Sequence, residues 1–112
     1  MNDNPWIELC PGIKRQTTTS GERLYQQLAK LDAGSRLPEH QHHQDQIAYV
    51  VSGHVSLVVG GVPHDLSAGD CVYIPSDVPH SAETFEDTVI IDTFTPPRDD
   101  YLAKDQEARR AQ

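Results

Sequence analysis

The chain has 112 residues, 37% of them hydrophobic, and a formal net charge of −8. This length suits one domain over residues 1–112, and the acidic charge, with no basic patch, argues against nucleic acid or anionic membrane surfaces as partners. No apolar run approaches the roughly 20 residues that span a bilayer, and the N-terminus lacks a signal-peptide pattern, so we expect a cytoplasmic protein.

The first segment with a readable pattern is "LYQQLAKL", residues 24–31. Its leucines recur at helical spacing, which would favour a helix. Strict alternation instead places four residues on one strand face: Tyr25, Gln27, Ala29 and Leu31. Glycines bound the segment at positions 21 and 34, and everything after it is strand-like, so we predict a strand.

From residue 34 onward, glycine and proline punctuate short runs rich in valine, isoleucine and tyrosine. These runs are "QIAYVVS" (46–52), "HVSLVV" (54–59), "CVYIP" (71–75) and "TVIIDTF" (88–94), each of strand length. Turns are predicted at Gly53, at Gly60-Gly61 and over 67–70. Many short strands at regular spacing indicate a sandwich or a small barrel. From about residue 99 the charged tail favours a short helix or a frayed end.

Two cysteines, Cys10 and Cys71, are expected to be free thiols, because a chain without an export signal seldom forms a disulfide. Cys71 lies in "DCVYIP", where we interpret it as a small buried apolar residue.

The stretch "PEHQHHQDQ", residues 38–46, concentrates three histidines in four positions. In an extended chain His40 and His42 face one way and His43 the other, and Gln46 shares the parity of His40 and His42. Two imidazoles at a strand end form part of a metal site, whose third nitrogen must come from elsewhere. The candidate is His80, at the start of a later strand. The alternative is a polar loop without a ligand role.

The spacing of these residues follows two motifs, at 34–53 and 69–84. The first reads Gly34, five residues, His40, one, His42, three, Gln46, six, Gly53. The second reads Gly69, five residues, Pro75, four, His80. In order and spacing the pair resembles the signature motifs of the cupin family. The resemblance implies an all-β, single-domain antiparallel jelly-roll β-barrel with one divalent transition metal per chain (Zn, Ni, Fe or Mn) held by His40, His42, Gln46 and His80.

Three positions depart from the cupin motifs: Gln46 stands where glutamate is usual, Asp77 where glycine is usual, and Thr84 where asparagine is usual. The first departure changes the chemistry, because three imidazoles and an amide leave the metal charge uncompensated. Such a metal is a stronger Lewis acid and lacks the carboxylate that supports much non-haem iron oxygen chemistry. The ligand set therefore favours redox-neutral polarisation of a substrate oxygen over dioxygenase activity.

Two further stretches, "DTFTPPRDDYL" (92–102) and "NPWIELCPGIKRQ" (4–16), resemble the KdgF family of small cupins. That family linearises 4,5-unsaturated uronates from pectin or alginate breakdown. The resemblance implies that Asp92 is catalytic and that Phe94 and Arg98 bind a small anionic sugar-acid substrate. On residue type alone, Asp92 would be a structural acid, Phe94 a core residue and Arg98 a surface residue.

Two other activities stay open from the sequence. One is a cupin metal-dependent dioxygenase, and the other is a non-catalytic cupin that binds a small molecule such as a sugar acid. The family resemblance also implies a homodimer, to which the apolar residues Trp6, Ile7 and Leu9 could contribute a contact surface.

Overall fold

Residues 2–111, the part of the chain that the computed structural model describes, form strands and one C-terminal helix. The strands are β1 (Trp6–Cys10), β2 (Ile13–Ser20), β3 (Tyr25–Leu31), β4 (Arg36–His40), β5 (Asp45–Ser52), β6 (His54–Val59), β7 (Val62–Ser67), β8 (Cys71–Ile74), β9 (His80–Thr84) and β10 (Thr88–Thr95). The helix α1 runs from Asp99 to Arg110.

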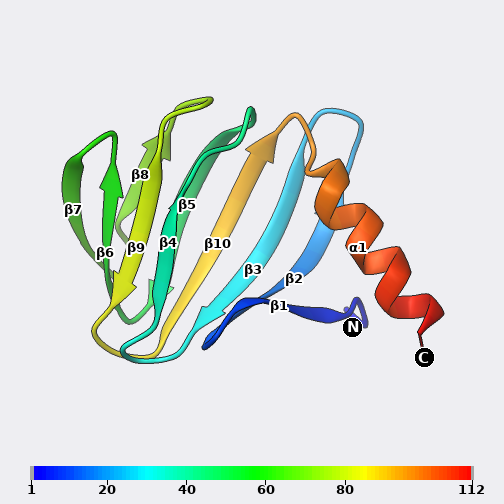
Figure 1. Ribbon diagram of the computed structural model, residues 1–112, viewed down its shortest axis with the longest axis horizontal. Helices are drawn as coiled ribbons and strands as arrows, with labels where there is room; N and C mark the ends of the chain where they lie inside the picture. Colours follow the sequence, from blue (N-terminus) through cyan, green and yellow to red (C-terminus); the bar gives the residue numbers. More distant parts are fainter. Residues whose placement is uncertain (1, 112) are drawn as a thin grey trace.

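The strands form two antiparallel sheets that enclose the interior between them (Figure 1). The larger sheet has the order β1-β2-β3-β10-β5-β8, and the smaller has the order β4-β9-β6-β7. In the larger sheet β10 lies between β3 and β5, so its inward side chains have neighbours on both sides. The architecture confirms the predicted all-β jelly-roll.

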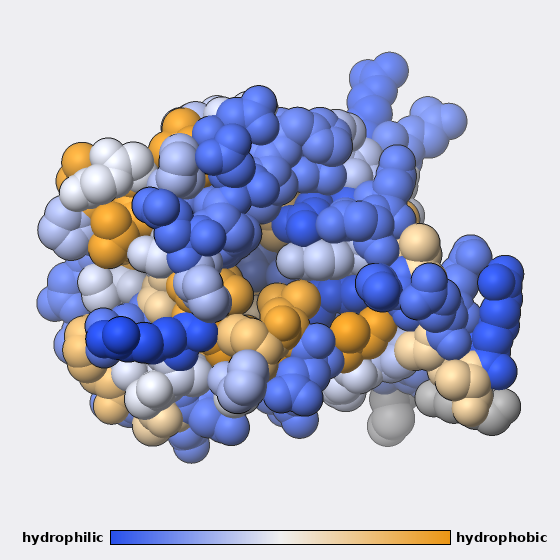
Figure 2. Space-filling view, in the orientation of Figure 1, coloured by the Kyte–Doolittle hydropathy of each residue, from blue (hydrophilic) through white to orange (hydrophobic). Residues whose placement is uncertain are grey.

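The apolar core lies between the sheets and consists of alternate residues from both. Its buried members are Ile13, Ala29, Leu31, Ala48, Val50, Val55, Leu57, Leu66, Ala82 and Ile90. Hydrophilic residues cover the upper and right parts of the face seen in Figure 2, whereas apolar residues gather over its left and middle. This apolar core does not fill the whole interior, because other buried positions carry polar side chains such as Gln27, Gln46 and Asp92.

The predicted strand over 24–31 is confirmed as β3, and the four later apolar runs are β5, β6, β8 and β10. Strands β1, β2, β4 and β7 had no predicted counterpart. In β2 the reason is that the inward side chains are polar: Arg15 and Thr17 are buried, so hydrophobic alternation is absent. In β4 the reason is Pro38, because a proline within a segment argues against a strand when only the sequence is considered.

The interpretation of Cys71 as a buried residue is wrong, because this side chain is exposed. Cys71 shares its parity in β8 with Tyr73, and both face outward, whereas Ile74 faces the core. The free state of both thiols agrees with expectation. At the other end of the chain, Leu9 packs on the core, so of the three residues proposed for a partner surface only Trp6 and Ile7 remain available.

Helix α1 is held against the larger sheet by a buried ion pair. Arg15 of β2 is 0% exposed and donates to Asp105 of α1 at 2.9 Å and to the Tyr101 carbonyl at 3.1 Å. The hydroxyl of Thr17 donates to the other Asp105 oxygen at 2.6 Å. The predicted tail is therefore an anchored helix, placed beside β2 and β3 (Figure 1). Among residues 2–111 no helix combines the length and apolar character needed to cross a bilayer.

We predict that Arg15→Met lowers the free energy of unfolding by about 3–5 kcal/mol, because Asp105 would stay buried without its cationic partner. The double variant Arg15→Met/Asp105→Leu should recover part of that loss. Chemical denaturation measures both. The control is Arg36→Met, which breaks an exposed pair with Glu83 and should cost less than about 1 kcal/mol. Equal losses for the buried and exposed pairs would contradict this account.

Candidate metal centre

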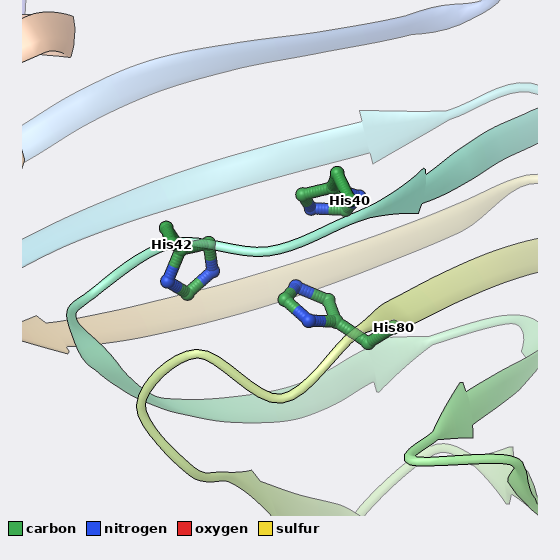
Figure 3. Close-up of side chains that lie close together, drawn as sticks. All are labelled: His40, His42 and His80. Carbon is green, nitrogen blue, oxygen red and sulfur yellow. The ribbon is translucent and has the colours of Figure 1, made fainter.

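Three histidines, two from the ends of strands and one from a loop, point toward one another in the interior cavity (Figure 3). His40 ends β4 and His80 begins β9, and the two are paired in register across the smaller sheet. His42 follows in the loop after β4. Their ligand nitrogens lie within 4.8 Å of one another, and the ring centroids of His40 and His80 are 4.2 Å apart. Strand pairing thus brings together imidazoles that are 40 positions apart in the sequence.

The three imidazoles share one hydrogen-bond arrangement, in which each Nδ1 contacts a backbone carbonyl. The distances are 2.8 Å from His40 to Pro38, 3.0 Å from His42 to Gln44, and 2.8 Å from His80 to Val78. A carbonyl only accepts, so each Nδ1 carries the proton and each Nε2 of a neutral ring keeps its lone pair. The Nε2 of His80 is buried and has no hydrogen-bond partner among the described residues.

Burial favours the neutral form of His80 and His42. The pKa of His80 is lowered to about 4, mainly by burial and also by the nearby His40, His42 and Arg98, while the hydrogen bond to the Val78 carbonyl opposes this shift. The pKa of His42 is also lowered, by burial first and then by Arg98. Neutral imidazoles with free Nε2 lone pairs are the form in which histidine binds metals, so the three histidines could hold one ion.

Gln46 supplies an oxygen beside these nitrogens. It points inward from β5, and its Oε1 lies 3.0 Å from Nε2 of His42. With the His42 proton on Nδ1, both facing atoms carry lone pairs, and a cation bound by both would make the contact favourable. The donor set therefore fits a divalent transition metal bound by neutral ligands.

Asp92 lies directly behind Gln46, on the inward face of β10, and is 6% exposed. Its Oδ1 accepts from Gln46 Nε2 at 2.9 Å and its Oδ2 from Gln27 Nε2 at 3.1 Å. Burial raises the pKa of Asp92 to about 6, while the amide donors and Arg98 oppose that rise. The carboxylate predicted at position 92 is thus buried in the same cavity as the imidazoles.

Phe94 and Arg98 line the same cavity, as the sequence resemblance implied. The ring of Phe94 meets His42 edge-on, with centroids 5.4 Å apart. Arg98 is only 6% exposed, so it is not the surface residue that its position after two prolines suggested. Its guanidinium stacks on Tyr101 at 3.7 Å, and its Nε and Nη2 donate to Asp100 at 3.1 and 3.0 Å. Asp100 therefore already occupies one bidentate edge of the guanidinium.

Two cavity residues were not predicted. Gln27 was placed on the inward face of its strand, and a polar residue at an inward position was the available signal. Tyr101 was interpreted as a packing residue, but it lines the cavity and its ring lies between Arg98 and Arg15. Its position three residues after Arg98 was the signal, because residues at that spacing share a helix face.

Asp77 and Thr84, the two departures from the cupin motifs outside the proposed ligand set, each have a local structural role. Asp77 has a φ of 61°, in the region that favours glycine, and its backbone N–H donates to the His42 carbonyl at 2.8 Å. This turn therefore fixes the loop that carries His42. Thr84 donates to the Asp32 carbonyl at 2.7 Å and accepts from the Ser35 N–H at 3.1 Å, which anchors the turn before β4.

The comparisons with known proteins point to one family. Residues 27–93 match the cupin domain family. The chain is 35% identical over 103 residues to the pectin degradation protein KdgF of Dickeya dadantii (strain 3937), covering 90% of this chain and 94% of that protein.

Two solved structures share both the fold and the sequence similarity. The structure of KdgF from Halomonas sp. superposes with a TM-score of 0.82 and 36% identity, covering 87% of this chain and 90% of that one. An RmlC-like cupin from Shewanella frigidimarina superposes with a TM-score of 0.83 and 32% identity, covering 88% and 89%. The chain with this histidine cluster is therefore a member of the cupin family.

Proposed function

We propose that the protein binds one divalent metal through His40, His42, Gln46 and His80 and catalyses ring opening of a 4,5-unsaturated monouronate from pectin or alginate breakdown. The likeness to KdgF over nearly the whole chain supports the substrate class. The cupin family supports metal binding, as does the shared orientation of the three imidazoles.

The observation that carries this proposal is the distribution of charge in the cavity. The four proposed ligands are neutral, and the carboxylate of Asp92 is one amide away from them. A bound metal would therefore keep its full Lewis acidity and would stabilise negative charge on a substrate oxygen. Asp92 remains free of the proposed ligand set, so it is available for proton transfer.

The reaction is an isomerisation that balances without an oxidant. The hemiacetal hydroxyl at C1 loses its proton, and the bond from C1 to the ring oxygen breaks. The ring oxygen leaves as an enolate of the C4–C5 double bond. Protonation at C4 then gives a ketone at C5, and an aldehyde remains at C1. One proton is removed and one is added, so a single acid–base residue can serve both steps.

The chain's own residues fit these needs. Asp92 faces the cavity from the centre of the larger sheet and can accept the C1 hydroxyl proton and deliver one to C4. Arg98 lines the same cavity and places a positive charge near the substrate carboxylate, with the Asp100 pair holding the guanidinium in place. Phe94 offers an apolar surface to the sugar ring. The homodimer, the cytoplasmic location and the extent of the domain over residues 1–112 stay predictions.

The proposed function predicts loss of the absorbance of the conjugated double bond when the protein meets a lyase-derived unsaturated monouronate. Turnover should continue without oxygen and without an organic cofactor, and a chelator should abolish it. Elemental analysis of the purified protein is the matching measurement. A metal-loaded protein that leaves every unsaturated uronate unchanged would refute the activity, and oxygen consumption would favour a dioxygenase.

For the metal site, we predict that His42→Ala and His80→Ala each lose most of the metal while the barrel stays folded. Each substitution removes one Nε2 lone pair from a cluster whose ligand nitrogens lie within 4.8 Å. The control is His43→Ala, because His43 is exposed outside the cluster and should leave metal content unchanged. Full occupancy in both ligand variants, measured by elemental analysis, would reject the assignment.

For the proton transfer, we predict that Asp92→Asn lowers kcat by about 10²–10⁴-fold, the usual contribution of a general acid–base group. Metal affinity should fall as well, because asparagine keeps one oxygen for the amide of Gln46 but turns an NH₂ group toward the donor of Gln27. Kinetics on the metal-loaded variant and elemental analysis separate the two effects. Wild-type turnover by this variant would remove Asp92 from the proposed chemistry.

A further inference from the structure

A buried chain of four side chains runs from the larger sheet to the histidine cluster. The hydroxyl of Tyr25 donates to Oε1 of Gln27 at 3.0 Å, and Nε2 of Gln27 donates to Oδ2 of Asp92 at 3.1 Å. Nε2 of Gln46 donates to Oδ1 of Asp92 at 2.9 Å. All four side chains are at most 9% exposed. Each hydrogen bond has a direction, from donor to acceptor, and the bonds from both sides converge on Asp92.

That direction matters because an amide has two different ends. The oxygen of Gln46 is a metal ligand, whereas its NH₂ group has no lone pair to offer. A carboxylate ligand would present an oxygen on either side and would need no such selection. Glutamine at this position therefore requires a neighbour that holds the amide in one orientation.

Asp92 meets that requirement only while both of its oxygens accept. Oδ1 attracts the Gln46 NH₂ group and so turns the Gln46 oxygen toward His42. Oδ2 is buried, and its partner is Gln27. Without that donor, Oδ2 would be an unsatisfied buried acceptor, and the carboxyl group would rotate to relieve it. A rotated carboxyl group would no longer hold the Gln46 amide in this orientation.

We propose that Gln27, held by Tyr25, is a positioning residue that acts through Asp92 to keep the Gln46 oxygen turned toward the three imidazoles. Tyr25 contributes through its hydroxyl, which lies 3.0 Å from the Gln27 oxygen and 2.9 Å from the Thr17 hydroxyl. Because Thr17 donates to Asp105, Gln27 and Thr17 share the single hydroxyl proton of Tyr25. The proposal rests on the metal site put forward above and is independent of uronate turnover.

Binding of Co²⁺ to the metal-free protein tests the proposal, followed by titration and by visible absorption, which reports the ligand set. Gln27→Met keeps the length of the side chain and removes its hydrogen bonds. It should weaken Co²⁺ binding about 10–100-fold, the usual effect of losing a hydrogen-bond partner that supports a metal ligand. Tyr25→Phe keeps the ring and removes one neutral hydrogen bond, so it should weaken binding about 5-fold. Both spectra should change.

The matched control is Gln26→Met, on the opposite face of the same strand. Gln26 contacts Thr18 rather than the cavity, so this variant should bind Co²⁺ like the wild type. Thermal unfolding of each metal-free variant reports any general loss of stability. If Gln27→Met does not fold, Tyr25→Phe decides the question.

The decisive measurement repeats the Gln27→Met substitution in the Gln46→Glu background. A glutamate presents an oxygen in either orientation, so Gln27→Met should there lose most of its effect on Co²⁺ affinity, giving a non-additive double-mutant cycle. Unchanged affinity in folded Gln27→Met would overturn the proposal, as would an equal loss in both backgrounds. A wild type that binds no Co²⁺ would overturn the metal site as well, whereas failed uronate turnover would leave this result intact.

Discussion

The buried carboxylate of Asp92 is the constraint around which the cavity is organised. A carboxylate that is 6% exposed must have its oxygens paired, and here the amides of Gln46 and Gln27 provide the pairs. They come from β5 and β3, the two strands that flank β10, so the pairing also reflects the strand order of the larger sheet. Burial of one acid thereby links three neighbouring strands and orients the oxygen that faces His42.

A second buried charge, on Arg15, positions Tyr101 in the wall of the cavity. Arg15 binds Asp105 and stacks on Tyr101 at 4.2 Å from its ring centroid. The ring of Tyr101 in turn stacks on the guanidinium of Arg98, which lines the same cavity as the histidine cluster. The helix therefore brings a positive charge to a cavity that already contains a buried acid. That arrangement suits a substrate that is itself an anion.

The cavity separates the two roles that a carboxylate could play beside a metal. Glutamate as a ligand would offset the charge of the ion, whereas the amide of Gln46 leaves that charge in place. The negative charge is instead held one residue further away, on Asp92. In the function proposed above, a neutral donor set and a separate acid–base group would favour redox-neutral chemistry. The same separation makes the orientation of a single amide matter for the whole site.

The sequence by itself determined the fold class, the strands with apolar alternation and part of the cavity lining, but not the cavity roles of Gln27 and Tyr101. It succeeded there because motif spacing and side-chain parity are local properties, as with His40, His42 and the inward face of β3. Only the tertiary structure showed that β2 is a strand with a buried arginine. Burial of Arg15 is stabilised by its ion pair with Asp105, which lies 90 positions away in the sequence. Likewise, the hydrogen bonds from Gln27 and Gln46 to Asp92 depend on strand order, which sequence separation does not encode.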